Sequence, residues 1–126
     1  MLTPEHYRKL LTDFPLLYKN NMYFEVDDGW FELLYRLSQE LECQLKFRSD
    51  PPKCEDFPHV DQVKTKYGGL RFYTSNIPGY MQDIIDMYET ESYTVCEDCG
   101  KPGTATGRGW IRTLCPSCAD EVKVKT

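Results

Sequence analysis

The chain has 126 residues, of which 40% are hydrophobic and 28% are charged, and its formal net charge is −5. This length limits the fold to one domain with one modest core, with room for a small appendage. The acidic balance argues against a dedicated duplex-DNA binder, because such proteins neutralise phosphates with an excess of Lys and Arg.

A first helix is predicted from Thr3 to about Asp13. Thr3 can cap it with its hydroxyl, Pro4 suits the first turn, and Glu5 lies near the positive end of the helix dipole. Pro15 discourages continuation, because the residue before a proline disfavours the helical conformation. After a turn signal at Asn20-Asn21, residues 22–26 are expected to be a short extended piece.

The main helix is predicted to begin at Asp27-Asp28-Gly29, with an Asp accepting hydrogen bonds from the free amides of the first turn. Its buried stripe follows helical spacing and consists of Trp30, Leu34, Leu37, Leu41 and Leu45, widened by Phe31. Most polar residues between them are expected to face solvent, namely Glu32, Arg36, Gln39, Glu40 and Glu42. Residues 49–58 contain three prolines and are expected to form a loop. Cys54 and His59 could be half of a second metal site, or a passive thiol and an exposed loop histidine.

A β-hairpin is predicted from Val60 to Tyr73, with Gly68-Gly69 as a two-residue turn. Counting outward, the expected facing pairs are Tyr67–Leu70, Lys66–Arg71, Thr65–Phe72 and Lys64–Tyr73. Strand alternation then places Val63, Thr65, Tyr67, Leu70 and Phe72 on the core side. The other face carries Lys64, Lys66, Arg71 and Tyr73. Facing cations disfavour pairing, so the sequence predicts either a compensating carboxylate, a partner's anion, or simple solvation.

A third helix is expected after Asn76-Ile77-Pro78-Gly79, with one apolar face. That face consists of Met81, Ile84, Ile85 and Tyr88. The acids on its opposite side are Asp83, Asp86 and Glu89, and Met87 is expected to pack rather than to bind a cofactor.

Two Cys-x-x-Cys pairs follow, Cys96/Cys99 and Cys115/Cys118, separated by fifteen residues that include a short glycine-punctuated hairpin. This spacing is typical of a four-thiolate Zn²⁺ site in a zinc ribbon, with residues 110–114 as its best strand. Four protein ligands leave no open position for water, which favours a structural zinc over a catalytic one. A redox role is the alternative, although neither pair lies in a βαβ context. Cys43 and Cys54 are interpreted as plain thiols.

The predicted fold class is therefore α+β, with helices packed on a small antiparallel β-hairpin or sheet and a C-terminal four-cysteine zinc ribbon. Residues 1–92 are assigned to the α+β domain and residues 93–126 to the ribbon. The first residues lack the basic and apolar regions of a secretory signal, and no apolar run approaches the roughly 18 residues of a membrane span. We therefore expect a cytoplasmic protein without a membrane partner.

Three stretches carry a resemblance: residues 62–73 (QVKTKYGGLRFY), residues 28–31 (DGWF), and the pattern Cys-x-x-Cys-Gly-x-Pro-Gly…Gly-Trp…Thr-Leu-Cys. Together they resemble a group of small zinc-ribbon proteins of bacteriophages and prophages that have no established function. The resemblance covers most of residues 27–118, but the proline-rich loop has no match in it. It implies a bacterial cytoplasm and a host-takeover or counter-defence role, and it transfers no catalytic residue.

The favoured function is a non-enzymatic, zinc-fixed module that binds another protein, with inhibition of a host or defence protein as its phage-type extension. The alternative is nucleic-acid binding through interleaved cations and aromatic rings. The candidate partner-binding residues are Lys64, Lys66, Arg71, Tyr73, Arg108, Trp110 and Arg112. An enzyme is disfavoured, since His6 and His59 are the only histidines and no nucleophile elbow, phosphate loop or HExxH motif occurs.

Overall fold

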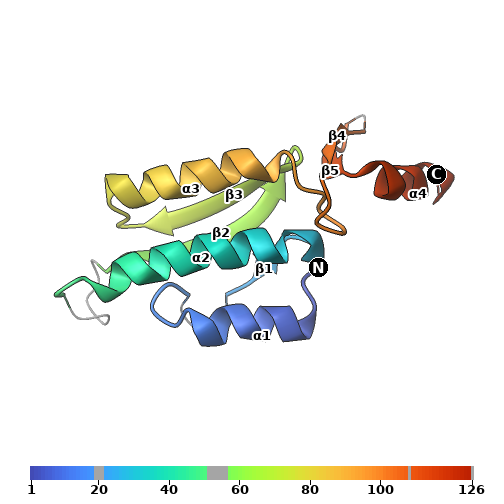
Figure 1. Cartoon of the computed structure of the whole chain (residues 1–126). Coiled ribbons are helices and arrows are strands. Elements are labelled where there is room, and N and C mark those ends of the chain that lie inside the picture. Colours follow the sequence, from blue (N-terminus) through green and yellow to red (C-terminus); the bar gives the residue numbers. More distant parts are fainter. Residues whose placement is uncertain (19–21, 51–56, 108, 126) are drawn as a thin grey trace.

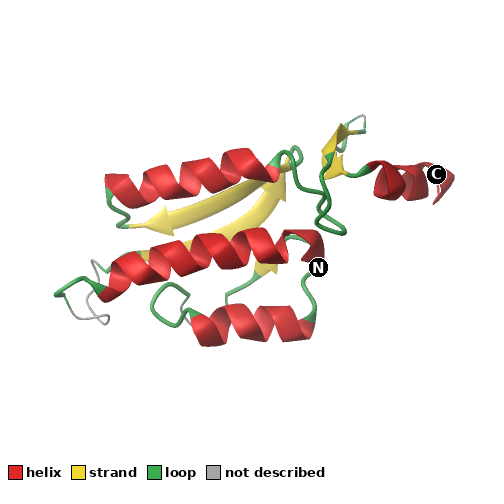
Figure 2. Cartoon of the chain, viewed as in Figure 1, coloured by secondary structure: helices red, strands yellow, loops and turns green. Residues whose placement is uncertain are grey.

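The computed structural model describes residues 1–18, 22–50, 57–107 and 109–125 (Figure 1). Over these residues the chain is a mixed α+β protein with two small sheets (Figure 2). Its elements in order are α1 (Pro4–Asp13), β1 (Phe24–Glu25), the 3₁₀ turn η1 (Asp28–Trp30), α2 (Phe31–Lys46), β2 (His59–Lys66), β3 (Gly69–Ser75), α3 (Gly79–Ser92), β4 (Thr104–Thr106), β5 (Arg112–Leu114) and α4 (Pro116–Lys125).

The larger sheet has the strand order β1-β2-β3, and helices α2 and α3 cover one of its faces (Figure 1). β2 and β3 are antiparallel, but β1 pairs with β2 in parallel, through Phe24–Val63 and Glu25–Lys64. The predicted antiparallel hairpin is therefore present, whereas the parallel pairing of β1 was not predicted; the long connection through α2 brings the chain back in the same direction.

The core lies between this sheet and the helices. The predicted stripe of α2 is confirmed, since Trp30, Leu34, Leu37 and Leu41 are fully buried. Phe24, Val63 and Phe72 meet it from the sheet. From α3, Met81 and Ile85 are fully buried, whereas Met87 is exposed and does not pack as expected.

The link between α1 and α2 differs from the prediction. Thr3 caps α1, as expected, by accepting from the His6 backbone N–H at 3.1 Å. Asp27 and Asp28 make no side-chain capping bond to the helix that follows them, because the chain first forms the 3₁₀ turn η1. Asp28 instead accepts from the Thr3 N–H at 3.1 Å and lies 2.6 Å from His6 Nδ1, so it ties α1 to α2.

Two glutamates that were expected to face solvent instead accept hydrogen bonds from backbone N–H groups of other segments. Glu42 is buried and accepts from the N–H groups of Leu16 and Leu17 at 3.1 and 2.9 Å. Glu89 of α3 accepts from the Phe72 N–H at 2.9 Å, while Ser92 Oγ accepts from the Leu70 N–H at 2.9 Å. Two amides of β3 that point away from β2 are thereby bonded to side chains of α3.

The hairpin turn lies one residue earlier than predicted, at Tyr67-Gly68, and both residues have positive φ, +53° and +78°. The facing pairs are Thr65–Leu70, Lys64–Arg71 and Val63–Phe72. Gly69 is needed for packing instead, since a Cβ there would lie 2.3 Å from the Tyr93 ring. The shift moves each partner by two positions, so the faces survive, but Tyr67 becomes 63% exposed at the tip.

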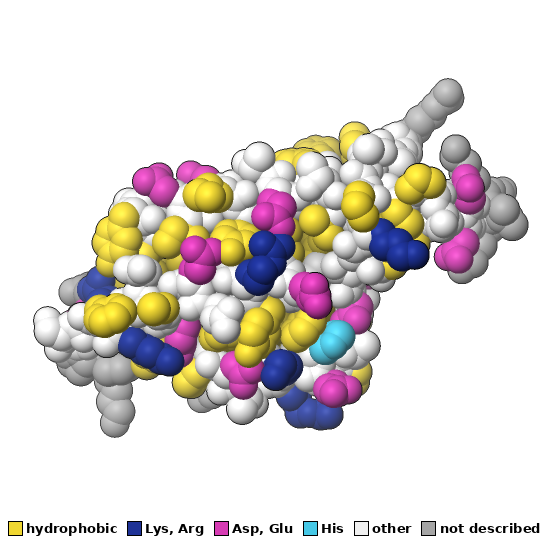
Figure 3. Space-filling view, in the orientation of Figure 1, with side chains coloured by type: hydrophobic (Ala, Val, Ile, Leu, Met, Phe, Trp, Pro, Cys, Tyr) yellow, Lys and Arg dark blue, Asp and Glu magenta, His cyan; other side chains and the backbone are white. Residues whose placement is uncertain are grey.

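The C-terminal segment, residues 93–125, lies at one end of the helix–sheet layer, and α4 projects away from it (Figure 1). β4 and β5 form an antiparallel pair that we call the C-terminal hairpin. On the face shown in Figure 3, acidic and basic side chains are interspersed with hydrophobic ones. Within the described ranges, none of the helices has the length and apolar character needed to cross a membrane.

Candidate metal centre

The first cysteine pair lies in a tight turn after α3. The Cys96 N–H donates to the Lys101 carbonyl at 2.7 Å, and the Gly100 N–H donates to the Cys96 carbonyl at 3.0 Å. Gly100 has φ +84°, a conformation that glycine adopts without strain. The turn therefore presents Cys96 and Cys99 on one side.

The second pair lies where the C-terminal hairpin runs into α4. β5 ends at Leu114, and Pro116 is the first residue of α4. The Cys118 N–H donates to Cys115 Sγ at 3.4 Å, and the Ala119 N–H donates to the Cys115 carbonyl at 2.9 Å. This helix was not predicted, although Pro116 directly after Cys115 is a helix-start signal.

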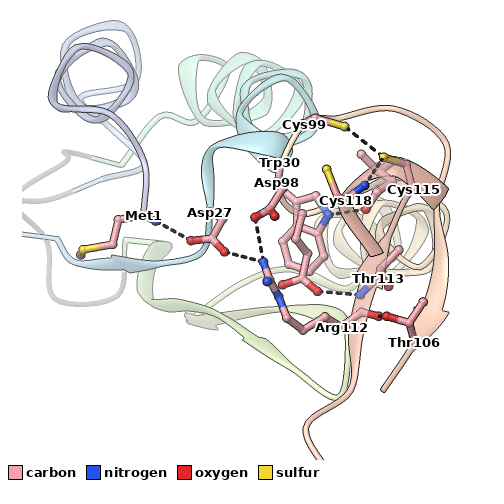
Figure 4. Close-up of polar contacts among 12 residues, drawn as sticks. Met1, Asp27, Trp30, Asp98, Cys99, Thr106, Arg112, Thr113, Cys115 and Cys118 are labelled. Atoms are coloured by element: carbon pink, nitrogen blue, oxygen red, sulfur yellow. Dashed lines mark hydrogen bonds and ion pairs between the residues drawn. The ribbon is translucent and has the colours of Figure 1, made fainter. Parts of the chain in front are cut away.

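The four predicted ligands come together. Cys96, Cys99, Cys115 and Cys118 have sulfur atoms that all lie within 4.8 Å of one another. The sulfurs of Cys99 and Cys115 are 3.5 Å apart (Figure 4). A tetrahedral ion with metal–sulfur bonds of about 2.3 Å needs sulfurs about 3.8 Å apart. The donor set and its spacing therefore fit one thiophilic metal ion, and these four cysteines could hold it.

The thiols also interact electrostatically, so that each affects the pKa of its neighbours. The Cys118 backbone N–H and the neighbouring thiols lower the pKa of Cys115 to about 7. The pKa of Cys118 is raised, chiefly because its thiol donates to Cys115. Ionising one thiol thus makes ionisation of the next one harder, and a bound cation is what would stabilise several thiolates in this space.

The first cysteine turn is docked on the start of α2. The Gly29 N–H donates to the Glu97 carbonyl at 2.8 Å, and the Trp30 indole donates to the Val95 carbonyl at 2.8 Å. A Cβ on Gly29 would lie 2.3 Å from the Cys96 oxygen and 2.4 Å from the Glu97 oxygen. Only a glycine allows this approach, so the candidate metal site and the main core are in direct contact.

Thr113, which is bonded to Glu97, attaches the same segment to the tip of the β2–β3 hairpin. Glu97 is 1% exposed, and it accepts from the Thr113 N–H at 2.7 Å. Burial raises the pKa of Glu97. The Thr113 hydroxyl donates to the Gly68 carbonyl at 2.6 Å. Sequence reasoning missed both residues, because their partners are distant in the chain.

Arg112, a predicted partner-binding residue, is used inside the molecule. Its guanidinium donates to Asp27 at 2.8 Å and to Asp98 at 2.9 Å, and its side chain is 22% exposed (Figure 4). Asp27 also contacts the amino group of Met1. The ion pairs join β5 to the start of η1 and to the first cysteine turn.

The other predicted partner-binding residues are distributed as follows. Lys64, Lys66, Arg71 and Tyr73 lie on the sheet face opposite the buried Val63 and Phe72, and we call this the open sheet face. Lys64 has Glu25 on one side and Arg71 on the other, and Arg71 donates to the Tyr93 hydroxyl at 3.0 Å. Trp110 is 78% exposed, and Arg108 lies outside the described residues.

Two remaining candidates are now placed. Cys43 is an exposed free thiol on α2. His59 begins β2 rather than lying in a loop, and its Nε2 is 3.1 Å from Asp61. Cys54, its suggested metal-binding partner, lies outside the described residues.

A cavity of about 580 Å³, which we call the junction cavity, lies between residues 109–112 and one end of the open sheet face, near Lys66 and the tip of the β2–β3 hairpin. Its rim includes the exposed rings of Tyr23, Tyr67 and Trp110, and Asp27 and Arg112 also line it. Sequence reasoning did not identify Tyr23, because only the parallel β1–β2 pairing brings it beside this face.

Comparison with known proteins adds nothing to this geometry, since no protein-family model, no curated protein and no solved structure matches the chain.

Proposed function

We propose that residues 93–126 form a zinc ribbon in which Cys96, Cys99, Cys115 and Cys118 bind one structural Zn²⁺. Support comes from the mutual closeness of their sulfurs and from the preference of zinc for four thiolates in closed sites. When bound, the ion would supply the free energy that holds a segment with little core of its own. Cys96, Leu114 and Cys115 are the buried hydrophobic residues of that segment among those described.

We further propose that the protein acts without catalysis, by binding another protein. A four-thiolate shell leaves the ion no position for a substrate, which argues for a structural role. The single observation that carries the proposal is the junction cavity, with three exposed aromatic rings on its rim. Exposed Tyr and Trp are enriched where proteins bind one another. Inhibition of a host or defence protein in a bacterial cytoplasm is the form that the phage-type resemblance suggests.

The test is quantitative affinity capture from bacterial lysate with matched variants. Trp110→Ala removes a rim ring, whereas Phe47→Ala removes an equally exposed ring (82%) at the far end of α2. We expect one protein to be recovered in near-stoichiometric amount by the wild type and by Phe47→Ala, and to be lost with Trp110→Ala. Recovery of no stoichiometric protein, or equal recovery by all three, would contradict the proposal.

Nucleic-acid binding is the second candidate, and the open sheet face favours it. Lys64, Lys66 and Arg71 lie there beside Tyr73, an arrangement that suits single strands. The candidate is weaker because Arg112 is held by two carboxylates. It predicts salt-sensitive binding of single-stranded RNA or DNA, measured by fluorescence anisotropy.

A charge-matched pair of double variants tests this second candidate. Lys66→Ala with Arg71→Ala should abolish binding, whereas Arg8→Ala with Lys46→Ala removes two cations from exposed positions on α1 and α2 and should leave it unchanged. An absence of binding at low salt would remove the candidate.

A further inference from the structure

We propose that the junction cavity binds a positively charged Arg or Lys side chain of the partner protein. This inference rests on the proposed protein-binding function and names the chemistry that the partner must present. Three features of the cavity carry it: the rings on its rim, the balance of charge on its lining, and the origin of its two walls.

The rings are the first feature. Tyr23, Tyr67 and Trp110 are 60%, 63% and 78% exposed and line the same cavity, although they come from three separate parts of the chain. A volume of about 580 Å³ is suitable for a long side chain. Aromatic faces attract cations, and Trp does so best. Lys66 already shows the preference, because its ammonium lies 5.7 Å from the centre of the Tyr67 ring.

The charge is the second feature. Among the described lining residues, Glu25, Asp27 and Glu97 carry carboxylates, and Lys66, Arg112 and the amino group of Met1 carry cations. Arg112 is further neutralised by Asp98, which leaves its charge less available to a guest. Asp27 already pairs with Arg112 and with the amino group of Met1, and Glu97 is buried against Thr113. Glu25 is therefore the exposed carboxylate of the lining that a guanidinium or ammonium group would meet.

The origin of the walls is the third feature. One wall comes from Tyr23–Asp27 and the tip of the β2–β3 hairpin, and the other from Gly109–Arg112 of the C-terminal segment. Thr113 and Arg112 hold the second wall against the first. The cavity therefore exists only while the C-terminal segment is docked, and its guest is recognised by both parts of the chain together.

The test uses a pair of short peptides of Gly and Ser with one central residue, Arg in the first and its neutral isostere citrulline in the second. Binding is read from the indole N–H resonance of Trp110 as peptide is added. Trp30, the other tryptophan, is fully buried and bonded to the Val95 carbonyl, so its resonance is an internal control. We expect saturable binding of the Arg peptide and about tenfold weaker binding of the citrulline peptide.

Three variants sharpen the test. Glu25→Gln should lower the affinity for the Arg peptide about threefold. Asp83→Asn, which changes an exposed acid on α3, should leave that affinity unchanged. Lys66→Met should tighten binding about threefold, because it removes a cation that competes for the Tyr67 ring. Binding of nucleic acid to the same surface would instead weaken with Lys66→Met, so the sign of this effect separates the two partners.

Equal affinity for the two peptides would overturn the inference, as would an unshifted Trp110 resonance or a Trp110 shift produced by oligothymidylate instead. The proposed protein-binding function and the cationic guest can each be refuted without the other. If affinity capture depends on Trp110 but the Arg peptide does not bind, the protein-binding function stands and the cationic guest is wrong. If no protein is captured while the Arg peptide binds selectively, the cavity chemistry stands and the protein-binding function is wrong.

Discussion

Replacing Gly29 with alanine should loosen the contact between the first cysteine turn and α2. The added Cβ would lie 2.3 to 2.5 Å from three backbone atoms of Cys96 and Glu97. Ordinary carbon contacts are about 3.5 Å or longer, so the turn would have to move by about 1 Å. The backbone of Gly29 has no positive φ, and its need for glycine is therefore purely steric.

The magnitude follows from what that movement disturbs. Overpacking of this kind costs about 1–3 kcal/mol. The turn would also weaken the bonds from the Gly29 N–H to Glu97 and from the Trp30 indole to Val95, each worth about 1 kcal/mol. We expect the free energy of unfolding to fall by about 2–5 kcal/mol in total.

The assay is urea denaturation at a fixed excess of Zn²⁺, followed by tryptophan fluorescence. The control is Gly79→Ala at the first position of α3, where an added Cβ meets nothing within 4 Å. That variant should be neutral or slightly stabilising, because alanine is the better helix former. If Gly29→Ala were as stable as Gly79→Ala, the inference that the cysteine turn packs too closely on α2 for a side chain at position 29 would be refuted.

Three further predictions concern the metal, a buried acid and an ion pair. Purified protein should contain about one Zn²⁺ per chain by elemental analysis, Cys115→Ser should lose it, and Cys43→Ser, at an exposed thiol, should keep it. Burial raises the pKa of Glu42 above 4.5, so its contribution to the free energy of unfolding should decline as the pH rises through the range above that value. Urea titrations from about pH 4 to pH 7 should therefore show the advantage of the wild type over Glu42→Gln shrinking with pH, and a constant difference would contradict this. Arg112→Met and Asp98→Asn should each destabilise the chain with a coupling energy of about 1 kcal/mol in a double-mutant cycle, whereas additive effects would show that the pair contributes nothing.

Local sequence patterns predicted an element correctly where its structure depends on nearby residues alone. The capping of α1 by Thr3, the buried stripe of α2 and the closeness of the four cysteines were all readable from spacing. Each depends on residues near one another in the chain or on ligands with a fixed chemistry. The helix after Cys115 was also readable from Pro116, and this signal was missed.

The structure differs from the prediction where a contact with a residue distant in sequence determines the local conformation. Gly68-Gly69 allowed two turn positions, and the packing of Tyr93 on Gly69 selects one of them. Glu42 had the pattern of a surface residue, but two free amides in the segment after α1 required an acceptor. Arg112 had the pattern of a free cation until Asp27, far away in sequence, was brought beside it.

The bonds from the Leu70 and Phe72 amides to Ser92 and Glu89 have a consequence for self-association. A bare outer strand offers a template on which a second molecule can stack, and such stacking is a common route to fibres. Here the template is already occupied by the chain's own helix. The other outer strand of the larger sheet is β1, which is two residues long and can offer a visiting strand few hydrogen bonds. Ser92 and Glu89 should therefore limit edge-to-edge association through β3 of the larger sheet in concentrated solutions.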